Sequence, residues 1–149
     1  GYMQRLSETG KYTVSDRVLR AVQAEFSCGF CTDAQGAQTI GRTFRESRYL
    51  LDTHTAVACT VLDAYRSGTG DQTLTVVEST ASPFKFCASV LDALGVTEHA
   101  PGTGVLGQLT TETGRPAPGP LASLAGKPVR FDQVTDRGDM RAVVTEFLR

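Results

Sequence analysis

The most informative stretch of this sequence is Thr73–Phe86, TLTVVESTASPFKF, in which a strand pattern passes through small hydroxyl residues into the start of a helix. Thr73–Val77 is apolar and β-branched enough to predict a strand covered on both faces. Ser82 is expected to cap the following helix, and Pro83 is expected to lie in the first turn of that helix. In open α/β sheets, such a junction presents backbone N–H groups and hydroxyls to a polar ligand. The stretch therefore predicts a binding site.

Helical patterns dominate the rest of the chain, and the residues before Asp16 are expected to be irregular. Each predicted helix has apolar residues at helical spacing. The first helix begins at Asp16, and the others are expected at about Asp33–Ser47, Thr53–Ser67, Ser82–Gly95, Val105–Thr111 and Asp139–Leu148. The last helix is expected to turn its apolar side chains inward.

Only one further strand is predicted, at Lys127–Val134, where Val129 and Phe131 alternate with polar residues. Two strands do not form a stable sheet alone, so either helices dominate the fold or the chain belongs to a larger sheet. The predicted fold class is α/β, with mostly helices packed around two or more strands. Residues 1–149 are expected to form a single domain.

Composition excludes several classes of function. The chain has 149 residues, of which 40% are hydrophobic, and 15 basic against 16 acidic residues give a net charge of −1. The sequence contains no basic block of the kind that would suggest a nucleic-acid partner. It also contains no long apolar run that would predict a membrane span or an export signal. The four cysteines are expected among apolar helical positions and not in loops, which predicts reduced, mostly buried thiols in a cytoplasmic protein.

Cys28-Gly29-Phe30-Cys31 has the spacing of a redox CxxC pair. Redox chemistry needs a thiolate at the N-terminus of a helix that follows a strand, whereas this motif follows a helix. A structural origin is therefore favoured, and a zinc site lacks a second pair of ligands. The alternative function that remains open is a stand-alone helical interaction module with a redox-responsive CxxC pair.

Gly102–Gly107 matches GxGxxG by letter. The dinucleotide fingerprint requires a preceding strand, and here a helix end and a Pro-containing loop come before it. This segment is predicted to be a flexible loop.

Ser82-Pro83-Phe84-Lys85 matches the SxxK motif of serine acyl enzymes. Those enzymes also carry an SDN element, and this chain contains no asparagine. Ser82 is better explained as a helix cap. Lys85 would lie in the first helical turn, where a cation is unfavourable, so it is expected either to meet an anion or carboxylate or to stay in solvent.

Two motifs together resemble a known family. Asp52–Ala58, DTHTAVA, is followed by Ser79–Phe86, STASPFKF. They resemble the D-P-H-x-A-V-A and S-T-A-x-P-x-K-F segments in the C-terminal portion of threonine synthase, in the class found in fungi and many bacteria. Thr9–Val14 and the tail that starts at Lys127-Pro128-Val129 resemble the same family. Thr53 replaces the usual proline, and Ser82 the usual histidine.

The resemblance implies a pyridoxal-phosphate enzyme of fold type II, a lyase of threonine biosynthesis that converts O-phospho-L-homoserine and water into L-threonine and phosphate. In such enzymes a lysine holds the cofactor as a Schiff base, and a Gly-rich loop cradles its phosphate. The resemblance implies that both lie outside this chain, since its lysines, Lys11, Lys85 and Lys127, stand at other family positions. The chain is therefore expected to be a C-terminal segment, inactive alone and without covalently bound cofactor, whose partner is the N-terminal remainder of the enzyme. The start at Gly1 favours the same interpretation.

The resemblance also implies roles for individual residues. Thr80 resembles the residue that hydrogen-bonds the pyridine nitrogen, and a neutral hydroxyl there leaves that nitrogen largely unprotonated. The implied sites, none of them catalytic or metal-binding, are Thr80, Ser79 and Ala81 for the cofactor, and Lys85, His54 and Asp52 for the substrate. His54 alone would otherwise be interpreted as a capping or buried histidine. The exposed edge of the Thr73–Val77 strand would also allow a homodimer.

Overall fold

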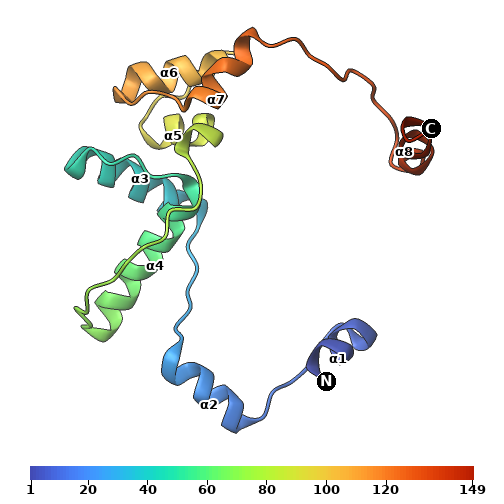
Figure 1. Ribbon diagram of the computed structural model, residues 1–149. Coiled ribbons are helices and arrows are strands. Elements are labelled where there is room, and N and C mark those ends of the chain that lie inside the picture. The colour runs from blue at the N-terminus through green and yellow to red at the C-terminus, as the bar shows by residue number, and fades with distance from the viewer. The chain divides into compact units, whose positions relative to one another are not determined.

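In the computed structural model, which describes all residues Gly1–Arg149, the chain is helical and contains no β-strand (Figure 1). The α-helices are α1 (Tyr2–Thr9), α2 (Asp16–Glu25), α3 (Asp33–Ser47), α4 (Thr53–Thr69), α5 (Cys87–Ala93), α6 (Gly104–Thr113), α7 (Gly119–Ala122) and α8 (Met140–Phe147). Two 3₁₀ turns, η1 and η2, span Pro83–Lys85 and Ser123–Gly126. Contacts divide the chain into two compact units, Gly1–His99 and Ala100–Arg149.

The core of the first unit forms where α3 packs against α4 and α5. Its buried apolar side chains are Ile40, Phe44, Leu51, Ala56, Phe84, Cys87, Val90 and Leu91. A Cβ atom added at Gly41 would lie 2.6 Å from the carbonyl oxygen of Ala93, so α3 and α5 approach backbone to backbone there. By contrast, α1 and α2 bury no side chain. The expectation of an irregular start was wrong, because Tyr2–Thr9 is helical.

Capping residues mark the start of α3 and both ends of α4. Thr32 and Gln35 form a reciprocal capping box at the start of α3, whose bounds match the prediction. The side chain of Asp52 caps α4. The prediction ended this helix at about Ser67, but α4 runs on to Thr69 because Gly70 is the residue that adopts the left-handed conformation, with φ of 74°.

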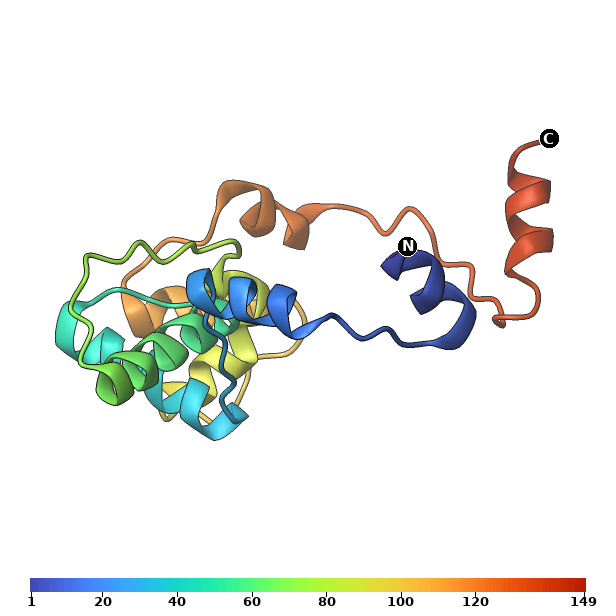
Figure 2. The ribbon, with the colours of Figure 1, turned by 90° about the horizontal axis from the view of Figure 1, so that it is seen from below.

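The prediction of strands at Thr73–Val77 and Lys127–Val134 was wrong for this chain. Neither range forms a ladder with any other part of the chain. Residues 70–81 instead run back along α4 as extended backbone in both views (Figures 1 and 2). A strand exists only when a neighbour accepts its N–H groups and supplies its C=O partners, and this chain offers none.

The second unit departs from the sequence prediction in two places. α6 begins at Gly104, so the second half of the Gly102–Gly107 motif is the first helical turn and not a loop. α8 has the expected position, but its apolar side chains do not face inward: Phe147 is 79% exposed and Met140 55%. They stay exposed because few residues of the unit pack on α8. None of the helices combines the length and apolarity needed to cross a bilayer.

Candidate functional site

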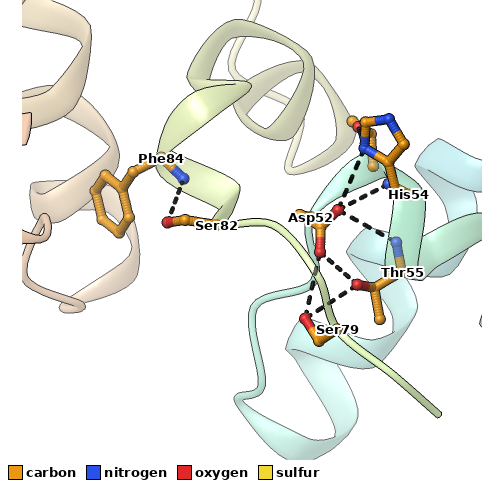
Figure 3. A network of polar contacts seen from close by, with 7 residues as sticks. Asp52, His54, Thr55, Ser79, Ser82 and Phe84 are labelled. Carbon is orange, nitrogen blue, oxygen red and sulfur yellow. Dashed lines mark hydrogen bonds and ion pairs between the residues drawn. The ribbon is translucent and has the colours of Figure 1, made fainter.

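Asp52 lies at the centre of a polar network at the start of α4 (Figure 3). Its backbone is extended, with φ of −80° and ψ of 167°, which turns the carboxylate over the first helical turn. Oδ1 accepts hydrogen bonds from the backbone N–H groups of His54 at 2.9 Å and Thr55 at 3.2 Å. Asp52 is only 1% exposed. The first turn of α4 thus supplies a buried carboxylate with the donors that it requires.

The second carboxylate oxygen connects α4 to a distant part of the chain. The Thr55 hydroxyl donates a hydrogen bond to Asp52 Oδ2, and the Ser79 hydroxyl donates to the same oxygen at 3.4 Å. The Thr55 and Ser79 hydroxyl oxygens lie 3.0 Å apart, so the three side chains form a closed triangle (Figure 3). Ser79 therefore anchors the end of the extended segment on the buried cap of α4.

The environment of Asp52 favours its charged form. Burial alone would raise its pKa, but the hydrogen bonds from Thr55, from the His54 backbone and from Ser79 outweigh burial and hold the pKa below its usual value of 3.8. The carboxylate is therefore ionised at neutral pH, and it is a pure acceptor for the hydroxyl of Ser79.

His54 faces the opposite side of this cap, and its side chain is 65% exposed. Its Nδ1 lies 3.5 Å from Asp52 Oδ1, and its ring centre lies 5.0 Å from that of Phe86. Both rings line a cleft of about 550 Å³ between the starts of α3, α4 and α5, with Ile40 and Val57 among the apolar residues of its wall. His54 is thus neither the cap nor buried, and its imidazole is accessible from the cleft.

The residues implied for the cofactor follow one another at the end of the extended segment. The Ser79 hydroxyl is engaged with Asp52, whereas Thr80 is exposed and makes no hydrogen bond within the chain. Ala81 is half-buried. The structure therefore brings Ser79 together with Asp52 and leaves the hydroxyl of Thr80 free.

The helix start after this segment is more complex than its sequence predicts. The Ser82 hydroxyl accepts a hydrogen bond from the Phe84 N–H at 3.3 Å, which confirms Ser82 as a cap with Pro83 in the first turn. That turn is the 3₁₀ turn η1, and the α-helix begins only at Cys87. Lys85 is exposed and forms no ion pair, so no carboxylate of this chain meets it.

Sequence reasoning missed two residues of this site. Thr55 joins Asp52 to Ser79 and is buried, and Phe86 lies beside the imidazole of His54. Thr55 is the third residue after an aspartate cap, the position from which a Glu or Gln side chain reaches back in a capping box. That spacing was the available signal for Thr55; nothing in the sequence pairs Phe86 with His54.

The cysteine pair lies apart from this network, in the connection between α2 and α3. Cys28 is exposed, Cys31 is half-buried, and both thiols are free. A Cβ atom at Gly29 would lie 2.8 Å from a methyl carbon of Val61, so the motif lies close against α4. No strand precedes it. No three His, Cys, Asp or Glu side chains gather closely enough to hold a metal ion.

Comparison with known proteins gives a consistent set of relatives. Residues 55–145, more than half of the chain, match the family model described as threonine synthase, C-terminal. Threonine synthase-like 1 of Homo sapiens is 29% identical over 94 residues, which is 63% of this chain and 12% of the human protein. The Mus musculus protein of the same name is 34% identical over 82 residues, 54% of this chain and 10% of that protein.

A solved structure resembles the chain over nearly its full length. The crystal structure of pyridoxal-phosphate-bound threonine synthase from Brucella melitensis matches with a TM-score of 0.69 and 28% sequence identity. The match covers 99% of this chain but only 27% of the Brucella protein. The chain thus spans a small part of each relative that it matches.

Proposed function

This chain belongs to the threonine synthase C-terminal family, and from that membership we propose that it is the C-terminal segment of an enzyme that converts O-phospho-L-homoserine and water into L-threonine and phosphate. The observation that carries the proposal is its likeness, over 99% of its length, to a pyridoxal-phosphate-bound threonine synthase. The parent protein would be a lyase of threonine biosynthesis. A reducing cytoplasm suits its four free cysteines.

The segment Ser79–Ala81 is suited to line one side of the cofactor. Thr80 carries an exposed hydroxyl without a partner, and Ser79 is fixed by a buried carboxylate, so the neighbouring backbone is held in place. When bound, pyridoxal phosphate supplies an electron sink for the carbanion chemistry of the substrate. The hydroxyl of Thr80 is the group that we assign to its pyridine nitrogen, where a neutral partner moderates that sink.

We assign the remaining cofactor contacts to the rest of the enzyme. A phosphate cradle requires a glycine-rich loop at a helix N-terminus after a strand, and the only such letter pattern here, Gly102–Gly107, follows a loop. The N-terminal remainder is therefore the partner that completes the site, and the chain alone should be inactive.

Of the three residues implied for the substrate, we propose direct roles for Lys85 and His54 and an indirect role for Asp52. Lys85 is exposed and unpaired, so its ammonium group is available to the phosphate of O-phospho-L-homoserine. His54 offers an accessible imidazole beside Phe86. Asp52 is too deeply buried to meet a substrate directly, and we propose that it acts by positioning Ser79.

The function is tested in a chimaeric enzyme in which this chain replaces the matched region of B. melitensis threonine synthase. The chimaeric enzyme should release phosphate and threonine from O-phospho-L-homoserine, and the chain alone should not. Thr80→Asp in the chimaeric enzyme should protonate the pyridine nitrogen, because a carboxylate stabilises the positive charge. The nitrogen-15 resonance of labelled cofactor should move accordingly, and turnover should fall by about tenfold or more, equivalent to about 1.4 kcal/mol.

Two control variants sharpen this result. Thr80→Ser keeps the hydroxyl and should preserve the resonance, and Thr97→Asp adds the same charge at an exposed position after α5. If Thr80→Asp leaves the resonance where Thr97→Asp leaves it, Thr80 does not contact the cofactor nitrogen. A chimaeric enzyme that binds cofactor but never forms threonine would contradict the proposed reaction.

A further inference from the structure

The hydroxyl of Thr55 has no part in capping α4. Capping uses the backbone N–H groups of His54 and Thr55, which both donate to Asp52 Oδ1. The Thr55 hydroxyl donates instead to Asp52 Oδ2 and lies 3.0 Å from the Ser79 hydroxyl oxygen. Because Thr55 is only 4% exposed, its hydroxyl depends on these two partners. The hydroxyl therefore serves the connection between α4 and Ser79.

The Ser79 hydroxyl is held from two sides. It donates its proton to Asp52 Oδ2 at 3.4 Å, which is a long hydrogen bond, and its oxygen accepts from the Thr55 hydroxyl at 3.0 Å. A hydroxyl carries one proton, so Ser79 has none left to donate to a ligand. Without the Thr55 hydroxyl, only the long bond to Asp52 would hold this side chain.

The direction of Ser79 also determines the direction of Thr80. Neighbouring side chains of an extended segment lie on opposite sides of the backbone. Since Ser79 turns toward the start of α4 (Figure 3), Thr80 turns away from it, which agrees with the exposure of Thr80 and its lack of a hydrogen bond within the chain. The two neighbouring hydroxyls therefore differ, because only Thr80 keeps a proton that is free for a ligand.

We propose that Thr55 is a positioning residue of the cofactor site: its buried hydroxyl holds Ser79 against α4 and thereby directs the hydroxyl of Thr80 to the pyridine nitrogen. The inference rests on the proposed function, which supplies the cofactor. An unprotonated pyridine nitrogen accepts a hydrogen bond, and Ser79 cannot be the donor while its proton is bound to Asp52. Thr55 acts only through Ser79, because its own side chain is buried.

Thr55→Val in the chimaeric enzyme tests this role. Valine keeps the shape of the side chain but removes the hydroxyl, so Ser79 should lose its fixed position and Thr80 its alignment. The nitrogen-15 resonance of labelled cofactor should move in the same direction as in Thr80→Val. Because the lost alignment affects the reacting cofactor, kcat should fall by about tenfold while KM changes by less than about twofold. Thr55→Ser keeps the hydroxyl and should restore the resonance and kcat.

Thr39→Val is the matched control for the loss of a buried hydroxyl. Thr39 on α3 is 5% exposed, and its hydroxyl oxygen lies 2.8 Å from that of Thr60 on α4. This variant should lower the melting temperature as Thr55→Val does, yet leave the resonance and kcat unchanged. Equal changes of the resonance in the two variants would overturn the proposal, because the effect would then come from lost stability.

Ser79→Ala tests the route from Thr55 to Thr80. Ser79 is exposed, so its replacement should leave the fold intact, yet it should move the resonance as Thr55→Val does. A resonance that stays in place in Ser79→Ala would contradict the proposal. If every variant keeps the kcat and the resonance of the unmodified chimaeric enzyme, Thr55 lacks this role and the proposed function stands. If the resonances move as expected but no threonine forms, the role of Thr55 stands and the proposed reaction fails.

Discussion

Asp52→Ala is expected to lower the free energy of unfolding of the first unit by about 3 kcal/mol, measured by urea denaturation of the chain. The substitution removes the cap of α4, which is worth about 1 kcal/mol. Because the Thr55 N–H that loses this acceptor is buried, the cost should exceed that of an exposed cap by about 1–3 kcal/mol. Because Ser79 loses its anchor as well, the amides after it should exchange faster.

The matched control is Ser15→Ala, which removes an exposed cap. Ser15 accepts a hydrogen bond from Val18 N–H at 3.5 Å at the start of α2, a helix without buried residues. That change should cost less than about 1 kcal/mol. Equal losses for Ser15→Ala and Asp52→Ala would contradict the assignment of Asp52 as a buried anchor.

The charge of Asp52 makes the same site sensitive to acid. Because its pKa in the folded chain is below the usual 3.8, ionisation stabilises the fold above that value, and this contribution is lost as the pH falls through the folded pKa. Asp52→Asn keeps an acceptor for the cap but removes the titration. The fall in stability below about pH 4 should therefore be smaller in Asp52→Asn than in the unmodified chain.

Gly41→Ala is expected to destabilise the first unit by about 2 kcal/mol, because the new methyl group would meet the Ala93 carbonyl oxygen at 2.6 Å. Backbone atoms cannot turn aside as a flexible side chain does, so α3 and α5 must separate. The control is Gly36→Ala on the same helix, where no atom lies within 4 Å of the new methyl group. That change should stabilise the chain by up to about 1 kcal/mol. The same sign for both variants in thermal denaturation would contradict the close packing of α3 on α5.

The sequence predicted helix starts correctly where neighbouring residues alone determine them. The start of α3 follows from Thr32 and Gln35, and the role of Ser82 follows from the proline after it. Such signals act over a few residues, so they operate whatever else the protein contains.

The sequence-based predictions were wrong where the conformation depends on residues that are distant in the sequence or outside this chain. Thr73–Val77 has the composition of a buried strand, but a strand needs a ladder partner, and this chain has none. The inward face expected for α8 stays exposed for a similar reason. In the site, Asp52 and Ser79 are in contact although they lie far apart in the sequence, and neither residue alone predicts this contact.

We propose that this chain supplies one side of a cofactor site whose lysine lies elsewhere. The location of that lysine is tested by adding stoichiometric pyridoxal phosphate, reducing with borohydride, and mapping the modified lysine by mass spectrometry. We expect no pyridoxyl group on Lys11, Lys85 or Lys127 in the chain alone. In the chimaeric enzyme, we expect one such group on a lysine of the Brucella portion. A pyridoxyl group on Lys85 in either protein would show that the cofactor lysine lies within this chain.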